Sequence, residues 1–477
     1  MRLLYLLFFA LITIQSVAAS TIKQDTMPDS VFENLPEDPS QAASTLVYRL
    51  ENLGYALVVV TPSANGSFLL EQGRISQIQV FNGSQKVTTK IESLLAPLMQ
   101  HDVLTIDTLD NVLSLVNDLH GVKVSFALNR LGDSAEYLLQ VNVTEHHSSG
   151  IFVVDTSPRS NLSQRRISLH QEYFGVAEGG DVLRLNLSFN EGKQSQADVL
   201  GFDVAYQAAL DQRGAFYEVG LGRSSARTDF DLTAVAESNY TSDHLNLIMG
   251  KDLTRQLDRS EVIYAESMLV KDRHDGVGDG NLALVRGSYF SRLDLYDGVS
   301  SSYGVTFTWG REDHHINTND KNFSSIRLGF GRIMPMLNFG DTAEVKVELA
   351  AQMATKDTPD SELFYLGSTD VLRGFDLSRY AGETGASLVI EGAYSEILGN
   401  TSIKPFVFLD AGYVENDSLT TATSRPSSNV IASAGIGLDY QFNDSLNSIR
   451  MWLGKPIHDD ESALDGPTTY VQFQTAW

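Results

Sequence analysis

Hydrophobic positions recur with two different periods along this chain, one before residue 147 and another after it. In the first part, Leu46, Leu50 and Leu53 are spaced by four and three, and residues 87–98 repeat that spacing. Residues three or four apart share one face of a helix. The first part is therefore predicted to contain amphipathic helices, with Pro97 shortening the second of them.

Strand-like runs surround these helices. Over residues 73–146, one such run, two helical stripes and two further runs give the order β-α-α-β-β, which predicts a small α+β layer with helices on one face of a short sheet. Residues 41–72 supply one helix and two strands. Residues 20–40 are polar, carry Pro and Asp, and show no sustained period, so we expect a flexible leader there.

From Gly150 onward, apolar and polar residues alternate one by one. Over residues 182–190, Leu and Phe alternate with Arg, Asn and Ser, and residues 344–352 oppose aliphatic to charged side chains in the same way. Such alternation is typical of a membrane barrel with lipid outside and water inside, although a soluble sandwich alternates as well. We favour the barrel because the alternation persists to the final strand, "TYVQFQTAW", and because aromatic residues cluster near strand ends.

The length of the alternating region predicts the strand number. About 330 residues follow the small domain, and at roughly ten residues per strand plus turns they suit a barrel of about 16 antiparallel strands. Our segmentation gives 16 or 17 strands. Since closed antiparallel barrels of this kind prefer an even number, we predict 16 and place one false break between residues 228 and 256.

Composition and charge indicate where such a chain works. The 477 residues carry a formal charge of −25 and contain no cysteine, and the mean hydropathy of −0.11 fits neither a helical membrane protein nor a disordered chain. The acidic balance disfavours nucleic-acid partners, and the missing cysteines disfavour a disulfide-stapled secreted domain. Residues 1–19, with Arg2 before an apolar run to Ile14, predict a cleaved signal peptide. We therefore expect a bacterial envelope protein.

One loop stands out, "FYLGSTDVLRGFDLSRYAGETG" at residues 364–385, because it carries arginines and aromatics between strand-like segments. Downstream, the apolar residues of the strand 402–414 share one face, so Asp410 on the other face should point into the lumen. A lumenal carboxylate and a loop-borne arginine can form a bidentate pair. Gly412 would leave room beside that carboxylate for another backbone. From these residues alone, a surface loop with a solvated arginine is the favoured interpretation.

These residues carry a family resemblance. "LGSTDVLRGFDLSRYAGETG" followed by "SLVIEGAY", with "FLDAGYV", "FGVAEGGDVLRLNLSF" and "MWLGKPI", is similar to the signature of two-partner-secretion outer-membrane transporters of the FhaC/ShlB/HecB haemolysin secretion/activation type and of their barrel-assembly relatives. In that superfamily a long loop folds back into the pore. The resemblance implies two site motifs here, a pore-loop motif of Arg373, Gly374 and Phe375 and a barrel-wall motif of Phe408, Asp410 and Gly412. With these motifs we predict that the loop lies in the pore and that Arg373 binds Asp410 there.

The resemblance also implies a domain plan. The family usually has two complete POTRA domains and often a plug helix, whereas residues 20–70 leave room for a shortened first POTRA at best. The expected parts are a signal peptide (1–19), a flexible leader (20–40), a shortened first POTRA-like segment (41–72), a POTRA domain (73–146) and a transmembrane barrel (147–477) with its pore loop (354–385).

The function implied by the resemblance is export of a large adhesin- or haemolysin-type partner protein from the periplasm to the cell surface, without cofactor or metal. The POTRA region would lie in the periplasm and bind the unfolded partner, and the barrel would lie in outer-membrane lipid. The C-terminal strand ending in Trp477 would be read by the barrel-assembly machinery. We expect a monomer.

Three other functions stay open: a barrel-insertion factor of the same superfamily, a diffusion porin with a periplasmic module, and an outer-membrane enzyme. No nucleophile–base motif or phosphate-binding glycine loop is apparent, so we expect no enzymatic activity. The pairs His146–His147 and His314–His315 lack metal-ligand spacing, and "KDRHDGVGDGN" does not match a calcium loop. Glu391 is expected to be part of a polar pore wall.

Overall fold

The computed structural model describes most of the chain beyond residue 26. The predicted signal peptide lies outside the described residues. Among the helices of the described part, none is long and apolar enough to cross a membrane. The described ranges are 27–63, 67–100, 104–132, 134–156, 165–191, 198–211, 213–228, 238–256, 258–274, 278–295, 298–314, 317–336, 342–356, 358–376, 378–416, 428–442, 446–460 and 466–477.

The segment before residue 73 contains one helix and two strands, as predicted. Helix α1 (Pro39–Asn52) begins after Asp38, whose carboxylate accepts two backbone N–H groups of the first turn at 2.9 Å. This N-cap satisfies donors that a helix end otherwise leaves unpaired. Strands β1 (Val58–Pro62) and β2 (Phe68–Gln72) pair antiparallel as a separate two-stranded sheet.

The predicted flexible leader differs from what the structure shows between residues 27 and 38. Met27 and Val31 are buried against Leu46 and Leu50 of α1, and Val31 ends a turn of 3-10 helix, η2 (Asp29–Val31). The sequence pattern missed this contact because two apolar residues in a polar segment have no period. The helix itself leaves an apolar face that they cover.

The order β-α-α-β-β predicted for residues 73–146 is observed. Pro97 ends the second helix, which continues as one 3-10 turn. Strand β3 lies parallel to β5 in a sheet of order β3-β5-β4. The elements are β3 (Arg74–Phe81), α2 (Gln85–Leu95), η3 (Ala96–Met99), α3 (Ile106–Asn117), β4 (Val122–Arg130) and β5 (Glu136–Glu145).

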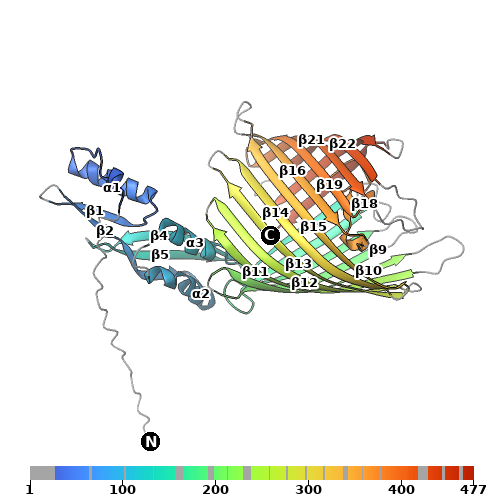
Figure 1. Cartoon of the computed structure of the whole chain (residues 1–477), viewed down its shortest axis with the longest axis horizontal. Helices are drawn as coiled ribbons and strands as arrows, with labels where there is room; N and C mark the ends of the chain where they lie inside the picture. The colour runs from blue at the N-terminus through green and yellow to red at the C-terminus, as the bar shows by residue number, and fades with distance from the viewer. Residues whose placement is uncertain are drawn as a thin grey trace, which may run out of the picture. The chain divides into compact units, whose positions relative to one another are not determined.

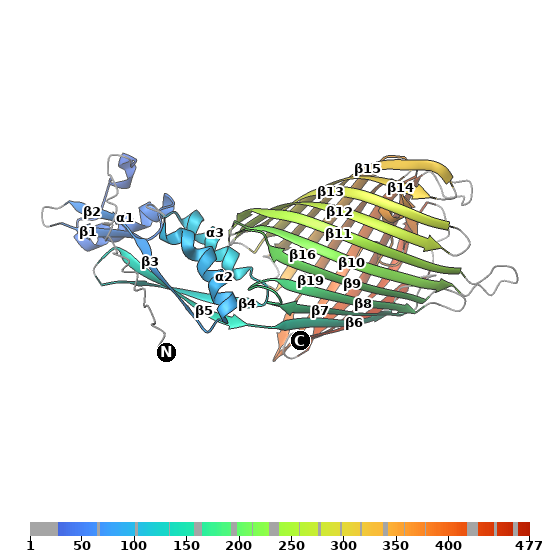
Figure 2. The ribbon, with the colours of Figure 1, turned by 90° about the horizontal axis from the view of Figure 1, so that it is seen from below.

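The rest of the chain forms a closed antiparallel barrel (Figures 1 and 2). Its strands are β6 (Ser148–Thr156), β7 (Arg165–Phe174), β8 (Val182–Glu191), β9 (Asp198–Ala209), β10 (Ala215–Thr228), β11 (Ser238–Arg255), β12 (Arg259–His274), β13 (Gly278–Asp294), β14 (Ser300–His314), β15 (Asn317–Pro335), β16 (Ala343–Ala354), β19 (Thr384–Tyr394), β20 (Glu396–Leu398), β21 (Thr401–Glu415), β22 (Ser428–Gln441), β23 (Asn447–Asp459) and β24 (Thr468–Ala476).

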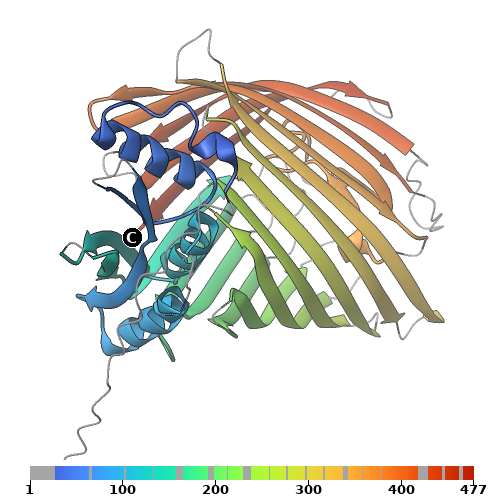
Figure 3. The ribbon, with the colours of Figure 1, turned by 60° about the vertical axis from the view of Figure 1, so that its left-hand side comes forward.

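The barrel has 16 strands when β19 and β20, which both pair with β21, are taken as one. This confirms the predicted number, and the single long strand β11 occupies the region where we placed the false break. Strand β24 closes the barrel by pairing with β6, from Gln472 opposite Asp155 to Ala476 opposite Ile151. Figure 3 shows the strands running obliquely around the barrel, as closure of a sheet requires.

The chain between β16 and β19 folds into small elements of its own. A 3-10 turn, η5 (Asp360–Glu362), comes first, and β17 (Phe364–Leu366) then pairs antiparallel with β18 (Tyr380–Gly382). We call residues 355–383 the pore loop. Arg373, Gly374 and Phe375 lie in the connection between these two short strands.

Candidate functional site

The wall that faces the pore loop is built by alternation along β21. Val407 and Leu409 are 58% and 46% exposed on the outer face, whereas Phe408 and Asp410 between them are 4% and 0% exposed. On the neighbouring strand β19, Glu391 pairs in register with Phe408 and is also buried. The structure thus confirms that Asp410 points inward, and it places a second carboxylate beside it.

Arg373 of the pore loop binds Asp410 through three hydrogen bonds. Its Nε and Nη2 donate to the two carboxylate oxygens at 3.0 and 2.9 Å, and its backbone N–H donates to Oδ2 at 2.9 Å. Both side chains are almost fully buried, at 1% and 0% exposure. The predicted contact is therefore present, in the bidentate geometry that a guanidinium and a carboxylate favour.

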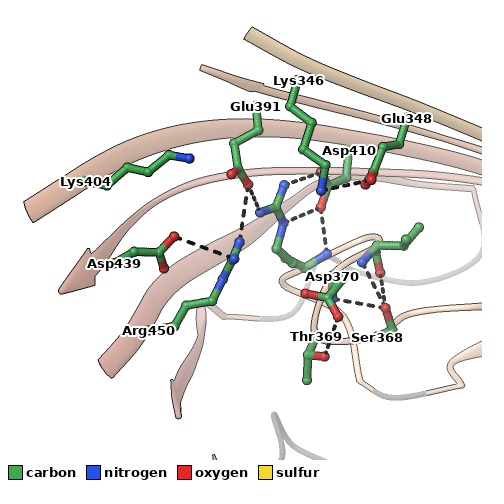
Figure 4. A network of polar contacts seen from close by, with 12 residues as sticks. Lys346, Glu348, Ser368, Thr369, Asp370, Glu391, Lys404, Asp410, Asp439 and Arg450 are labelled. Carbon is green, nitrogen blue, oxygen red and sulfur yellow. Dashed lines mark hydrogen bonds and ion pairs between the residues drawn. The ribbon is translucent and has the colours of Figure 1, made fainter. Parts of the chain in front are cut away.

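Three further groups complete the surroundings of this guanidinium. Nη1 of Arg373 donates to Glu391 Oε2, and the guanidinium carbon lies 3.7 Å from the ring centroid of Phe408. Arg450 of β23 lies 3.5 Å from the same Glu391 oxygen and 3.6 Å from Asp439. Figure 4 shows Glu391 and Asp410 side by side, with Arg450 and Asp439 extending the network beyond Glu391. We call Arg373 with Asp410 and Glu391 the Arg373 anchor.

The expected role of Glu391 is corrected by this geometry. We expected part of a polar pore wall without a specific partner, but its carboxylate binds the loop arginine directly. Sequence reasoning could have found it, since Glu391 is an inward-facing acidic residue on the strand next to Asp410. The signal was set aside because pore walls are generally polar.

Glycine allows the tip of the loop to lie directly against the wall. Gly374 has φ +112°, and a Cβ built on it would lie 3.0 Å from the backbone nitrogen of Lys455. A Cβ on Gly454 would lie 2.8 Å from the carbonyl group of Arg373. Two backbones thus approach each other here, which only residues without a side chain permit. Thr468 adds a hydrogen bond of 3.0 Å from its hydroxyl to the Gly374 carbonyl oxygen.

The predicted role of Gly412 needs a correction. It was expected to admit another backbone, but a Cβ there would meet side chains, 2.5 Å from Leu372 Cδ1 and 2.8 Å from Leu366 Cδ2. These residues belong to a buried apolar cluster that docks the pore loop on β21 and β22, made of Leu366, Leu372, Phe375, Val414 and Ile431. Phe375 therefore packs in this cluster, 3% exposed. The backbone approach that we expected lies at Gly454 instead.

The opposite end of the pore loop contacts a different part of the barrel. Glu362, 3% exposed, accepts a hydrogen bond of 2.6 Å from Arg286 Nη2 of β13, and its Oε2 lies 3.4 Å from Arg327 Nη2 of β15. Its carbonyl oxygen accepts hydrogen bonds of 2.9 Å from Arg327 and from Gln352 of β16. We call these four residues the Glu362 anchor. No sequence motif drew attention to it.

Small residues under the aromatic side chains were also missed. A Cβ on Gly435 or Gly437 of β22 would lie 2.3 or 2.1 Å from the ring of Phe408 or Phe406. The two rings thus lie over a strand that carries no side chains at those positions. The signal was available in "AGIGLDY", where glycines two apart occupy one face of a strand.

The contacts described above hold the pore loop against the barrel wall. Among the described residues, no group of three or more His, Asp or Glu side chains is placed to hold a metal ion. The side chains of His314 and His315 and the turn at 275–277 lie outside the described part. The paired charges, the aromatic rings and the close backbones all serve to position the loop.

A closed 16-stranded barrel, exposed apolar side chains on its outer face and a loop bound within its wall define the class: a transmembrane β-barrel with an inward-folded loop. A sequence profile of the haemolysin secretion/activation protein family ShlB/FhaC/HecB matches residues 270–440. That range contains the pore loop and the barrel-wall motif. The predicted resemblance to this family is confirmed over these residues.

Solved structures show the same fold. CdiB from Escherichia coli is 15% identical with a TM-score of 0.75, over 98% of this chain and 92% of that one. CdiB from Acinetobacter baumannii, also 15% identical, has a TM-score of 0.70 over 92% and 81%. BamA from Haemophilus ducreyi lacking POTRA domains 1–3 is 14% identical with a TM-score of 0.57 over 92% and 93%. No curated protein sequence matches this chain.

Proposed function

We propose that this protein exports one large partner protein of the adhesin or haemolysin type from the periplasm to the cell surface, through the lumen in which the pore loop is docked. The observation that carries the proposal is the burial of a loop arginine in a complete set of wall partners, Asp410, Glu391 and Phe408. A loop on the outer surface would not require a buried binding site for its arginine. A loop that occupies the lumen at rest and leaves it during export requires a site that defines its resting position.

The anchors can specify one docked position without preventing release. A buried ion pair contributes little net stability over an apolar contact, because desolvation offsets the attraction, but removing one partner costs about 3–5 kcal/mol. The docked loop is therefore well defined. Entry of an extended polypeptide, with polar groups of its own, can compensate the wall charges as the loop moves away.

Residues 73–146 are proposed to act as a periplasmic POTRA domain that catches the unfolded partner. Strands β3 and β4 are the two edges of the sheet β3-β5-β4, and an edge strand offers unpaired backbone groups to an extended chain. Folding of the partner outside the cell would give the transport its direction. No chemical reaction is part of this proposal, so we propose a transporter without enzymatic activity.

The test compares cells that contain the protein with cells that lack it, by quantitative mass spectrometry of medium, cell surface and periplasm. We expect one very large exported protein to disappear from surface and medium, and its export to return on complementation. A general loss of outer-membrane barrels would instead indicate a barrel-insertion factor. Slower uptake of small solutes with unchanged protein export would indicate a diffusion porin.

A further inference from the structure

The two anchors of the pore loop have opposite polarity. At the Arg373 anchor the loop supplies the cation and the wall supplies carboxylates on β19 and β21. At the Glu362 anchor the loop supplies the carboxylate and the wall supplies Arg286 and Arg327. The two wall sites belong to different strands, β13, β15 and β16 on one side and β19 and β21 on the other. Since β16 pairs with β19, the two sites lie on neighbouring stretches of the barrel wall, and the pore loop binds both of them.

The wall around Glu362 forms a binding site for this residue as a whole. Arg327 and Gln352 are opposite each other in the register of β15 and β16, and Arg327 Nε donates to the Gln352 side-chain oxygen. That contact orients both side chains so that their remaining N–H groups point at the Glu362 carbonyl. Gln352 is 3% exposed, as is Glu362. A buried polar network whose members are hydrogen-bonded in this way specifies one arrangement of its groups, so the position of Glu362 is well defined.

The two anchors differ in what release leaves behind. Arg286 also binds Glu266 of β12 at 3.1 Å, so this wall cation keeps an ion pair when Glu362 departs. Among the described residues, every hydrogen bond to Asp410 comes from Arg373, so departure of the arginine leaves a buried carboxylate without a cation. Burying an unpaired charge is the costlier outcome.

The Glu362 anchor is also more exposed and less completely hydrogen-bonded than the Arg373 anchor. The arginines at the Glu362 anchor are 16% and 36% exposed, against 1% for Arg373. Within the described part of the chain, Oε2 of Glu362 has no hydrogen-bond donor and only the 3.4 Å ion pair to Arg327, whereas both oxygens of Asp410 are hydrogen-bonded. Water can therefore reach the guanidinium groups of the Glu362 anchor more readily than that of Arg373.

We infer that Glu362 is a second positioning residue of the pore loop and that its anchor releases first, before the Arg373 anchor. This inference rests on the proposed function for its meaning in export, but the anchor itself can be tested without a partner protein. Opening then proceeds in two steps: a partly open lumen after the Glu362 end detaches, and a fully open lumen after the Arg373 end follows.

The experiment is single-channel recording of the purified full-length protein in planar bilayers. Glu362→Gln should raise the frequency of a small-conductance open state about tenfold, in keeping with the loss of hydrogen bonds to a charged group. Arg373→Gln should add a larger conductance state. Glu362→Arg and Arg286→Glu should each open the channel, and their combination should restore part of the closed state, which a purely structural role would not produce.

Folding is checked by heat-dependent migration of the barrel in gels, and Arg327→Gln provides a second variant with a more exposed partner and a smaller expected rise. Native recordings from Glu362→Gln and Arg327→Gln, with an effect of Arg373→Gln alone, would overturn the inference and leave the proposed function intact. Conversely, the expected recordings from these variants, together with cells whose protein export does not change when this chain is removed, would support the inference and contradict the proposed function.

Discussion

The two walls that the pore loop contacts share one sequence pattern and differ in burial. On β16, inward-facing Glu344, Lys346 and Glu348 are only partly buried, whereas on β21 inward-facing Phe406, Phe408 and Asp410 are at most 4% exposed. Alternation thus determines which face of a strand points inward. It does not determine whether water or a docked segment covers that face. The β19–β24 wall is specialised for the loop, whereas the β13–β16 wall binds the loop through ion pairs at Glu362, with hydrogen bonds to Thr355 and Glu383 in addition.

The inner face of the β19–β24 wall is buried because of its particular residue types, which the alternation of apolar and polar positions does not specify. Phe406, Phe408, Trp452 and Tyr470 pack as one cluster, with the Trp452 and Tyr470 rings stacked at 5.4 Å. Aromatic side chains have a large area to bury, and glycines on the adjacent strand let them lie flat. Aromatic side chains facing a water-filled lumen would stay exposed, so this buried cluster distinguishes the wall on which the loop docks.

Removing the arginine of the loop should change the difference between the two walls most, because it destabilises the docked loop. Arg373→Ala leaves Asp410 buried without a partner, which should destabilise the docked loop by about 3–5 kcal/mol. Planar-bilayer recordings should show large, long-lived open states, and export should fall. Arg223→Ala is the control, because that arginine lies on the outer face and is 60% exposed; a similar conductance change in the control would contradict the account.

Adding one methyl group at the tip should have the next largest effect. Gly374→Ala places a Cβ 3.0 Å from the Lys455 backbone in a left-handed conformation, so the tip must move, at a cost of about 1–3 kcal/mol. We expect intermediate channel opening with a normally folded barrel. Gly329→Ala on β15 has open space around it and should record as native. Equal behaviour of the two variants would refute the close approach.

Replacing the ring beneath the arginine should have a smaller effect. Phe408→Leu keeps an apolar side chain but removes a cation–π contact worth about 0.5–2 kcal/mol. Both ion pairs of Arg373 remain, so we expect a modest rise in open probability without loss of export. A double-mutant cycle with Arg373→Gln should give a coupling energy clearly different from zero, and simple additivity would show that the ring does not interact with the guanidinium.

Raising the salt concentration should affect the two anchors differently, and this is the smallest of the expected effects. Raising ionic strength from about 0.15 M to about 1 M shortens the Debye length from about 8 Å to about 3 Å, which screens partly exposed pairs more than buried ones. The small-conductance state assigned to the Glu362 anchor should become more frequent. The large state assigned to the Arg373 anchor should change little, and equal sensitivity of both states would argue against the difference in burial.

Much of this fold could be predicted because its periods are strong. Leu183 to Phe189 and Val345 to Ala351 alternate cleanly, and the helical stripe over residues 87–98 does the same for the small domain. Arg373 and Asp410 could be paired because each lies in a motif that resembles the two-partner-secretion family, in the order found there. Their side of the wall followed from alternation alone.

The rest depends on contacts between residues far apart in the sequence. Glu362 meets Arg286 across 76 positions, and nothing near either residue indicates the other. Gly454 is needed only because Gly374 lies against it, and Met27 is buried only because α1 presents an uncovered apolar face. Such contacts arise from closure of the barrel and docking of the loop, which local sequence does not encode.

The central claim is that the pore loop occupies the lumen at rest and must leave it for export. Because the native chain has no cysteine, Leu372→Cys with Gly412→Cys introduces one selective pair, at positions where a Cβ on residue 412 would lie 2.5 Å from the leucine side chain. With each single variant as control, we expect the oxidised double variant to stay closed in bilayers and to export nothing, and reductant to restore export of the protein that depends on this chain. Undiminished export with the disulfide formed would contradict the account.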